Sequence, residues 1–404
     1  MLGGLARRAT FIEELRRARK GVILVDTGDL FYSRPPAQTP NAPKMGDLKA
    51  DLYMKAYNLM GYDAFTPGEL DFSFGLAPIV KMSKQANFPF LAANLVDTKS
   101  GKPVFKAYTI KEVQGVKIGL LGLISNRYPL GGPPAEKEKF HLADPIETAK
   151  KLVPGLRKRC QVIAVLGHME ADEQEMLAKA VPEIFFILSG HVPNYQLNPG
   201  RANNSQIFNA GSRGEHLGQV DFWVEGKNLY ARYQLVGLTA KYTDHSRAQE
   251  LINQYKANLQ DLLQASPQAG LRGGPGPVRP EPVAPSSALY VGAGACLPCH
   301  PLQHQSWLET AHARAYQTLA KQNKSSDPAC LSCHTTGFGE VRKDPAVSLE
   351  NVQCEACHGV GDGHPDPWKN LPQVNETQCL KCHNSANSPN FSFAAYLQKV
   401  RHSK

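Results

Sequence analysis

Apolar and polar positions over residues 1–241, the N-terminal region, follow two alternating periods. Continuous apolar runs, which are typical of strands buried on both faces, occur at 22–25, 118–124, 162–166 and 184–188. Between these runs, apolar residues recur at helical spacing over about 5–19, 47–60, 76–86, 144–158 and 171–180. This alternation predicts a layered α/β domain.

The pattern of apolar positions changes toward the end of this region and again beyond it. Apolar segments 220–224 and 229–236 flank Glu225-Gly226-Lys227-Asn228, which predicts a β-hairpin. Residues 242–264 predict a connecting helix with one apolar face, and 265–287 are rich in proline, glycine, alanine and serine, as linkers are. Residues 288–404 form the C-terminal tail, which we expect to be a separate domain.

Composition narrows the class of protein. With 404 residues, 42% hydrophobic and 20% charged, the chain is typical of a globular protein of two to three domains. The net charge of +9 comes from scattered basic residues, so nucleic acid is not an expected partner. No run of 18 apolar residues occurs, so we expect no transmembrane segment.

Cysteine and histidine are concentrated in the tail. Eight of the nine cysteines lie between residues 296 and 382, and eight of the thirteen histidines follow residue 290. The tail also has few long apolar stretches, so its aliphatic side chains are too few to build a core of their own. We therefore expect another group to fill its interior.

The eight tail cysteines form four C-x-x-C-H motifs. They are Cys296/Cys299/His300, Cys330/Cys333/His334, Cys354/Cys357/His358 and Cys379/Cys382/His383. In such a motif the two thiols bond the vinyl groups of one porphyrin, and the histidine is the proximal ligand of its iron. Two Cys₄ zinc sites or a disulfide framework would also use eight cysteines, but neither requires a histidine after every second one. We therefore predict four covalently bound haems c.

The distal ligands of the irons are predicted by elimination. All seven methionines lie at or before Met176, so the tail offers none, and its histidines outside the motifs are His312, His364, His402 and His304. Bis-histidine ligation lacks the methionine that raises the potential, so low-potential electron carriers are expected. His304 lies one helical turn after His300 and is equally typical of a packing residue. Without it, one haem would be five-coordinate and open to a small molecule.

The tail resembles a known family. The stretches "YVGAGACLPCHPLQHQSWLETAHARAYQTL", "CLSCHTTGFG", "NVQCEACHGVGDGH" and "CLKCHNS" are similar to those of the tetrahaem cytochromes that accept electrons from hydroxylamine oxidoreductase. The resemblance implies a mainly α, haem-packed domain and places His312 and His364 at distal-ligand positions. Three motifs begin within 50 residues, which brings the haems close enough to exchange electrons.

Four residues of the N-terminal region are candidates for a different metal site. Asp29, His168 and His191 follow apolar runs, and Glu69 lies in "TPGELDFSFG". Polar residues at strand ends meet at the carboxyl edge of an α/β sheet, where ligand sites form. Singly, each is more typical of a satisfied polar residue. Together, carboxylates and imidazoles are suited to Mn, Fe or Zn.

The same region resembles the calcineurin-type metallophosphatases, specifically their 5′-nucleotidase branch. "GGLARRATFIEELRR", "VILVDTGDLF", "YNLMGYDAFTPGELDFSFG", "VLGHMEADE", "FILSGHVPN" and "NAGSRGEHLGQVDF" carry this likeness. It implies an α/β sandwich and a two-metal site that hydrolyses phosphate esters. Relative to that family, Glu69 replaces an asparagine ligand, Leu70 a catalytic histidine and Pro193 a second histidine. The first strand, with its D-x-H motif, is expected to be missing ahead of Gly3.

These departures leave the function of the N-terminal region open. One metal site would lose most of its ligands, and the other would keep Asp29, Glu69, His168 and His191. We expect an electron-carrying tetrahaem cytochrome whose degenerate metallophosphatase-like domain is a scaffold or docking domain, with one divalent metal or none. A metal-dependent phosphoesterase with an accessory haem domain and a haem-based reductase with a five-coordinate iron are the alternatives.

Haem attachment also predicts a location. Covalent haem c is attached outside the bacterial cytoplasmic membrane, so we expect a periplasmic or extracellular protein. Residues 1–20 form a charged amphipathic segment without the apolar core of a signal peptide, which predicts that coding sequence upstream of Met1 supplies one. The expected partners are redox proteins, other multihaem cytochromes or a second copy of the chain.

Overall fold

The computed structural model separates the chain into two compact units. One contains Met1–Arg34 and Pro43–Tyr255, and the other Pro35–Ala42 and Lys256–Lys404. The structure describes residues 2–33, 41–133, 138–226, 228–264, 289–322, 324–325, 328–338, 344, 347–361, 374–384 and 387–402. The predicted linker, 265–287, and the candidate ligand His364 lie outside the described residues.

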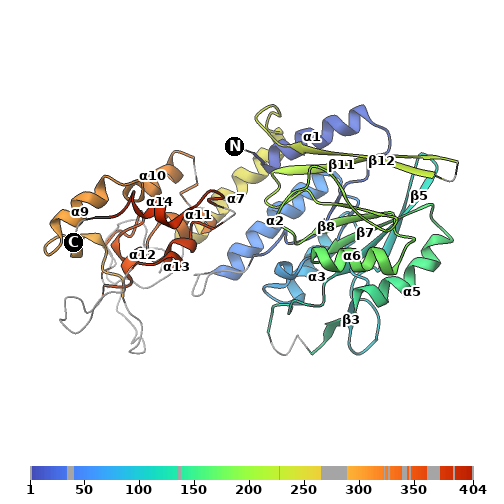
Figure 1. Cartoon of the computed structure of the whole chain (residues 1–404), viewed down its shortest axis with the longest axis horizontal. Coiled ribbons are helices and arrows are strands. Elements are labelled where there is room, and N and C mark those ends of the chain that lie inside the picture. Colours follow the sequence, from blue (N-terminus) through green and yellow to red (C-terminus); the bar gives the residue numbers. More distant parts are fainter. Residues whose placement is uncertain are drawn as a thin grey trace. The chain divides into compact units, whose positions relative to one another are not determined.

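A six-stranded sheet forms the centre of the first unit (Figure 1). Its strand order is β4-β5-β7-β8-β10-β9. The four central strands run parallel, and β4 and β9 are antiparallel to their neighbours at the two edges. The strands are β4 (Tyr108–Val113), β5 (Val116–Ile124), β7 (Val162–His168), β8 (Phe186–Gly190), β9 (Gly200–Ala202) and β10 (Ser205–Phe208).

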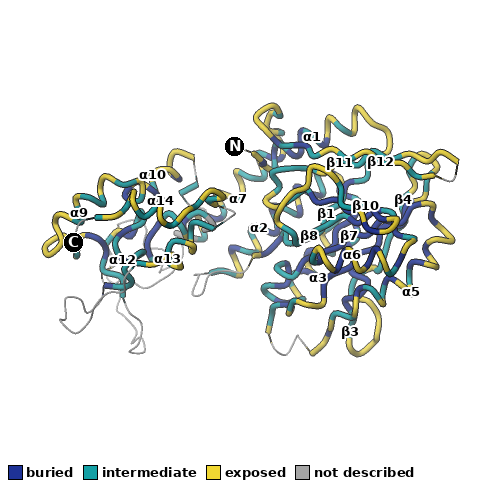
Figure 2. The backbone as a smooth tube through the Cα atoms, in the orientation of Figure 1, coloured by how far each residue is buried: buried dark blue, intermediate teal, exposed yellow. Residues whose placement is uncertain are grey.

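Both faces of this sheet are buried, as the continuous apolar runs predict. On β5, Leu121 and Leu123 pack toward α5 (Pro145–Arg157) and α6 (Ala171–Ala180), while Ile118 and Leu120 belong to a separate core cluster on the other side. This split follows from the two-residue period of a strand. Figure 2 shows the concentration of buried residues in the central strands.

Two further strand pairs pack on the second face of the sheet. The predicted hairpin is confirmed: β11 (His216–Glu225) pairs antiparallel with β12 (Asn228–Gly237), with Glu225 opposite Asn228. The run at 22–25 is strand over Val25–Asp26 only, where β1 pairs in parallel with β2 (Ala64–Phe65). Just before it, Leu24 donates its N–H to the side chain of Asp63 instead of a strand partner. An antiparallel pair, β3 (Leu95–Asp97) with β6 (Phe140–Leu142), completes the unit.

Helices α1 (Leu5–Ala18), α2 (Ala42–Met60) and α3 (Leu76–Gln85) share a further core with η1 (Glu69–Phe72). The first half of α7 (Ser246–Gln264), predicted as a connecting helix, contributes to that core: Ala248 is fully buried in it, and Leu251 and Ile252 pack against it. The start of α7 is therefore part of the first unit.

The second unit consists of short helices and has a small apolar core in the part that the structure describes. Its helices are α8 (Ala293–Cys296), α9 (Pro301–Leu308), η2 (His312–Arg314), α10 (Ala315–Ala320), α11 (Pro328–His334), α12 (Cys354–His358), α13 (Glu376–Leu380) and α14 (Phe393–Leu397). Its buried hydrophobic residues are Leu259, in the second half of α7, and Ala293, Ala313, Ala315, Leu319, Leu331 and Leu349. Across the described residues of the chain, no helix combines the length and apolarity needed to cross a bilayer.

Candidate functional site

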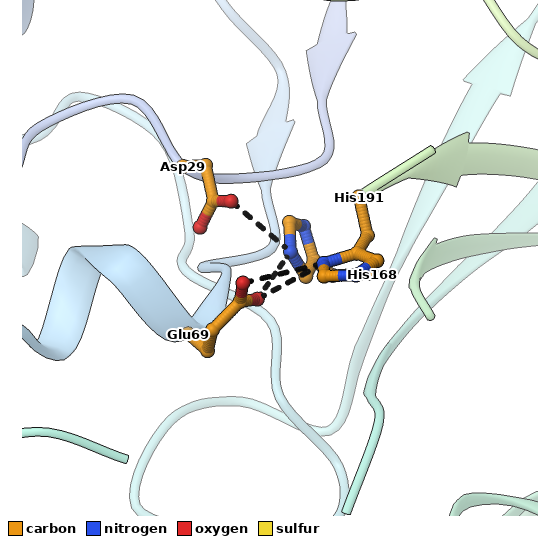
Figure 3. Close-up of side chains that lie close together, drawn as sticks. All are labelled: Asp29, Glu69, His168 and His191. Carbon is orange, nitrogen blue, oxygen red and sulfur yellow. Dashed lines mark hydrogen bonds and ion pairs between the residues drawn. The ribbon is translucent and has the colours of Figure 1, made fainter. Parts of the chain in front are cut away.

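Four side chains from separate segments converge in the first unit. Asp29 follows β1, Glu69 begins η1, His168 ends β7, and His191 directly follows β8. One ligand atom from each lies within 4.8 Å of the ligand atoms of the other three (Figure 3). Because β7 and β8 are parallel neighbours, both histidines are at the same edge of the sheet, as the sequence pattern predicts.

The backbone around this cluster is constrained. Asp29 has a φ of 57° and His191 a φ of 70°, the left-handed region that costs a non-glycine residue about 1–2 kcal/mol. Such conformations persist where the surrounding structure imposes them, and they occur often at functional sites. A Cβ on Gly68 would lie 2.2 Å from Asp29 Oδ1 and 2.4 Å from His168 Cε1. Only glycine at this position lets the two side chains approach each other.

His168 is held in one orientation. Its side chain is 1% exposed, and its Nδ1 donates to the carbonyl of Thr27 at 2.5 Å. Its Nε2 then faces the carboxylates, 2.7 Å from Glu69 Oε2 and 3.5 Å from Asp29 Oδ2. A metal-ligating histidine commonly uses one ring nitrogen for a fixed hydrogen bond and the other for the metal.

The cluster is strongly coupled electrostatically. Burial acts to raise the pKa of Glu69, but the hydrogen bonds from His168 and His191 outweigh it and hold that pKa well below its usual range. Burial acts to lower the pKa of His168, but hydrogen bonds and charge interactions with Asp29 and Glu69 raise it to about 10. The hydrogen bond to Glu69 likewise raises the pKa of His191. The site therefore attracts positive charge, whether a proton or a cation.

Asp71 supports this site, and sequence reasoning missed it. Its fully buried carboxylate accepts backbone N–H groups from Asp29, Leu30, Phe31 and Gly68 at 2.7–3.0 Å. Burial, together with the nearby Asp29 charge, raises the pKa of Asp71 to about 7. The available signal was an acidic residue two positions after Glu69, inside an otherwise apolar stretch.

Two further residues beside the metal cluster were not predicted from the sequence. Tyr128 lies after β5, and its ring stacks on that of His191 with centroids 4.6 Å apart. Glu170, the residue before α6, has Oε1 3.4 Å from His191 Nε2. Glu170 lies within the "GHMEAD" stretch, whereas nothing in the local pattern of Tyr128 distinguishes it.

Of the three positions that depart from the metallophosphatase pattern, Glu69 offers a metal ligand, whereas Leu70 and Pro193 do not. Leu70 is half-buried and donates its backbone N–H to Asp29 Oδ1 at 2.9 Å, and Pro193 is exposed. The donor set is therefore two carboxylates and two imidazoles. This set, with His168 Nε2 already facing the carboxylates, fits a single Mn, Fe or Zn ion.

Two pairs of histidine rings lie close together in the second unit. The ring centroids of His358 and His402 are 5.8 Å apart, and those of His312 and His383 are 6.0 Å apart. Two imidazoles on opposite sides of one iron, with metal–nitrogen bonds of about 2 Å, have their ring centres about 6 Å apart. The separation of both pairs therefore matches that of two histidines bound to one haem iron.

Two proximal candidates have their other ring nitrogen engaged. His334 Nδ1 donates to the carbonyl of Ala315 at 2.7 Å, and His383 Nδ1 lies 2.9 Å from Ser388 Oγ. The His383 ring also stacks on Phe391, with centroids 5.1 Å apart. These contacts leave Nε2 as the nitrogen available to iron, as in other metal-bound histidines.

The first haem motif is the least enclosed of the four. Cys299 is exposed, whereas the other seven motif cysteines are half-buried. A thiol that bonds a haem in the interior of the tail is expected to be covered, so Cys299 departs from that expectation. The reason is local: Cys299 lies in the turn between α8 and α9, where its neighbour Leu297 is also 44% exposed. Its assignment as a haem attachment residue therefore rests on the C-x-x-C-H spacing and not on burial.

The remaining histidines and thiols of the tail are placed as follows. His304 contacts Trp307, with ring centroids 5.3 Å apart, and His300 is the N-cap of α9. The thiol of Cys296 is within hydrogen-bonding distance of Cys354, and that of Cys333 of Cys382, so motifs distant in sequence are adjacent.

The alternative uses of the tail cysteines require disulfides or clustered metal ligands. All nine cysteines of the chain are free of disulfides. Among the described residues, the first-unit cluster is the one group with three or more ligand atoms close enough for a metal.

Comparisons with known proteins find different relatives for the two parts of the chain. Residues 295–359, which include the first three haem motifs, match the family described as cytochrome c554 and c-prime. The 5′-nucleotidase of Vibrio cholerae is 29% identical over 274 residues, 59% of this chain and 48% of its own length. The 2′,3′-cyclic-nucleotide 2′-phosphodiesterase/3′-nucleotidase of Salmonella typhimurium is 28% identical over 249 residues, 54% of this chain and 38% of its own.

Solved structures agree on the fold of the first unit. A 5′-nucleotidase precursor from Thermus thermophilus matches with a TM-score of 0.55 and 21% identity, over 65% of this chain and 54% of its own. The calcineurin-like phosphoesterase YfkN from Bacillus subtilis matches with a TM-score of 0.52 and 22% identity, over 65% of this chain and 91% of its own. The chain joins a calcineurin-like phosphoesterase fold to a cytochrome c554-type tail. It spans less than half the length of the curated relatives named above.

Proposed function

We propose that this protein is an exported electron carrier with four covalently bound haems c in residues 288–404. The pairing of His358 with His402, and of His312 with His383, at the spacing of a bis-histidine haem carries the proposal. When bound, each haem supplies a one-electron couple. The chain's own residues hold it through two thioethers, orient the imidazoles and set a low potential by offering no methionine.

The experiment is a haem count with a spin-state measurement. We expect an alkaline pyridine spectrum of the full chain, produced with the haem attachment machinery, to give four haems c per chain. His402→Ala and His312→Ala should each convert about one haem to high spin without changing the count. His141→Ala, at an exposed position of the first unit, is the control and should change neither quantity. A count below four, or no spin change in either variant, would contradict the proposal.

The first unit, in this proposal, binds one divalent Mn, Fe or Zn ion at Asp29, Glu69, His168 and His191 and acts as a scaffold or docking domain. The replacement of a catalytic histidine by Leu70 and of a second histidine by Pro193 supports a site without two-metal hydrolysis. Calorimetric titration with Mn²⁺ should give one ion per chain, and His168→Ala should abolish binding. Asp51→Ala, which removes a surface carboxylate paired with Lys55, is the matched control.

A metal-dependent phosphoesterase is the second candidate function. The convergence of four ligands in a fold shared with nucleotidases favours it. Hydrolysis of bis(4-nitrophenyl) phosphate with added Mn²⁺, lost in Asp29→Ala and kept in Asp51→Ala, would establish this activity. Binding of Mn²⁺ without hydrolysis would leave the scaffold role.

The haem-based reductase is tested by the same spectra. A high-spin haem in the unmodified protein would favour it, whereas purely low-spin bands would favour the electron carrier. We place the protein in the periplasm or outside the cell, because covalent haem c is attached beyond the cytoplasmic membrane. Its partners in this proposal are redox proteins, other multihaem cytochromes or a second copy of the chain.

A further inference from the structure

The two histidines of the metal cluster are held differently. His168 is buried, and its Nδ1 is fixed by a backbone carbonyl. The His191 side chain is 19% exposed and follows β8 in a left-handed conformation. Its Nδ1 lies 3.3 Å from Glu69, on the side of the metal cluster. The nitrogen on the other edge of the ring, Nε2, lies 3.4 Å from Glu170 Oε1. The Glu170 carboxylate therefore faces the outer nitrogen of His191 at ion-pair distance, whereas the carbonyl of Thr27 accepts a short hydrogen bond from the outer nitrogen of His168.

Glu170 is itself held from two sides. Its backbone N–H donates to Glu173 Oε2 at 3.0 Å, at the start of α6. The hydroxyl of Tyr128 donates a hydrogen bond to the Glu170 carboxylate, while the Tyr128 ring stacks on His191. One residue, Tyr128, thus contacts both the carboxylate and the imidazole that the carboxylate faces.

The loop that carries Tyr128 is anchored to the same helix. Arg127 makes two hydrogen bonds to the Asp172 carboxylate, at 2.9 and 2.7 Å, and Ser125 donates to Glu173 at 3.0 Å. The ends of β5 and β8 and the start of α6 therefore meet around the outer edge of His191.

We propose that Glu170 and Tyr128 form a positioning pair that turns Nδ1 of His191 toward the metal. A carboxylate that accepts the N–H of one ring nitrogen leaves the other unprotonated for the ion and strengthens it as a ligand. Tyr128 restricts both the carboxylate and the tilt of the ring. This inference rests on the proposed metal site. Glu170 acts through His191 and is not itself a ligand, because it lies on the opposite edge of the ring from Glu69.

The test is Mn²⁺ affinity measured by calorimetry on the full haem-loaded chain. Glu170→Gln keeps the size of the side chain but removes its charge, and should weaken Mn²⁺ binding roughly 10- to 100-fold. Tyr128→Phe should weaken it less, and the double variant should bind no more weakly than Glu170→Gln, because the tyrosine hydroxyl acts through the carboxylate. Glu175→Gln, a surface position on the same helix paired with Lys179, should bind like the unmodified protein.

A second readout separates positioning from a merely structural role. Without Mn²⁺, the melting temperature of Glu170→Gln should match that of the unmodified protein. At saturating Co²⁺, its visible spectrum should shift toward that of His191→Ala, because His191 is the ligand released. Equal Mn²⁺ affinity of Glu170→Gln and the unmodified protein would overturn this inference alone. Absence of Mn²⁺ binding by the unmodified protein would overturn the metal site and this inference with it.

Discussion

At single positions in both units, the space available and the hydrogen bonds that must be made determine which residue fits. Whether the residue is polar or apolar does not determine it. Gly68 has a φ of −97°, which any residue adopts, so its requirement for glycine comes from the crowding of Asp29 and His168 around it. Glu355, inside the third haem motif, is 4% exposed, and its carboxylate accepts three backbone N–H groups. Neither constraint is visible in the local sequence.

Gly68→Ala should disrupt the metal cluster. The added Cβ overlaps Asp29 Oδ1, and overpacking of this kind costs about 1–3 kcal/mol. We expect a lower melting temperature and loss of Mn²⁺ binding. Gly155→Ala is the control, because its Cβ would meet no atom within 4 Å and it lies inside α5, where alanine is favoured by up to about 1 kcal/mol. Unchanged Mn²⁺ binding by Gly68→Ala would contradict the described geometry.

Glu355→Ala should destabilise the second unit. It leaves the N–H groups of Val291, Gly292 and Gly361 without their acceptor, and a buried unsatisfied donor costs about 1–3 kcal/mol. We expect a loss of at least about 3 kcal/mol in the unfolding free energy followed by haem absorbance. Glu309→Ala, at an exposed position, should change it by less than about 0.5 kcal/mol. Equal effects of the two substitutions would refute the anchoring role.

At the scale of elements, a buried polar network ties α1 and α2 to β1. Arg8 of α1 donates to the hydroxyl of Tyr57 at 2.8 Å, and that hydroxyl donates to Asp26 of β1 at 2.7 Å. Tyr62 stacks on Tyr57 with ring centroids 3.7 Å apart. The helical and strand patterns predict each element, but they do not predict that a buried cation and two tyrosines join them.

This network predicts alkaline instability. Burial, together with the Asp26 charge, raises the pKa of Tyr57, and burial raises that of Tyr62. Below about pH 10 both tyrosines are protonated in the folded chain and in the unfolded chain, so they add no pH dependence to the unfolding free energy. Above it the unfolded chain ionises first, and stability should fall by about 1.4 kcal/mol per pH unit for each tyrosine. Denaturant unfolding between pH 9 and 11 measures the fall of the unfolding free energy with pH. Tyr57→Phe should remove about half of the part of that slope that Tyr57 and Tyr62 contribute together.

At the scale of the whole molecule, the chain joins two units that differ in what fills their interiors. The first has three clusters of buried side chains around its sheets, whereas the described second unit buries few large apolar ones. Haem therefore supplies the interior of the second unit in our proposal, and the two units should respond separately to perturbation.

Limited proteolysis tests this separation. Brief digestion should cut first within residues 265–287, because proline- and glycine-rich linkers are readily accessible to proteases. The products should be a coloured fragment that begins near residue 288 and a colourless one that ends near residue 264. First cuts inside residues 1–241 would contradict the predicted domain boundaries.

The sequence by itself predicted the covalent chemistry that we propose for the tail and determined the order of the elements. Haem attachment depends on spacing along the chain, so the four C-x-x-C-H motifs are readable without coordinates, and apolar periods likewise predicted the central strands and the hairpin. The tertiary structure decided which distant residues meet. The pairing of His312 with His383, the carboxylate of Asp71 under the metal cluster and the contact of Glu170 with His191 all depend on where strands and loops end in space. A one-dimensional pattern carries no distance between residues that are remote in sequence, so only the packed fold could reveal these contacts.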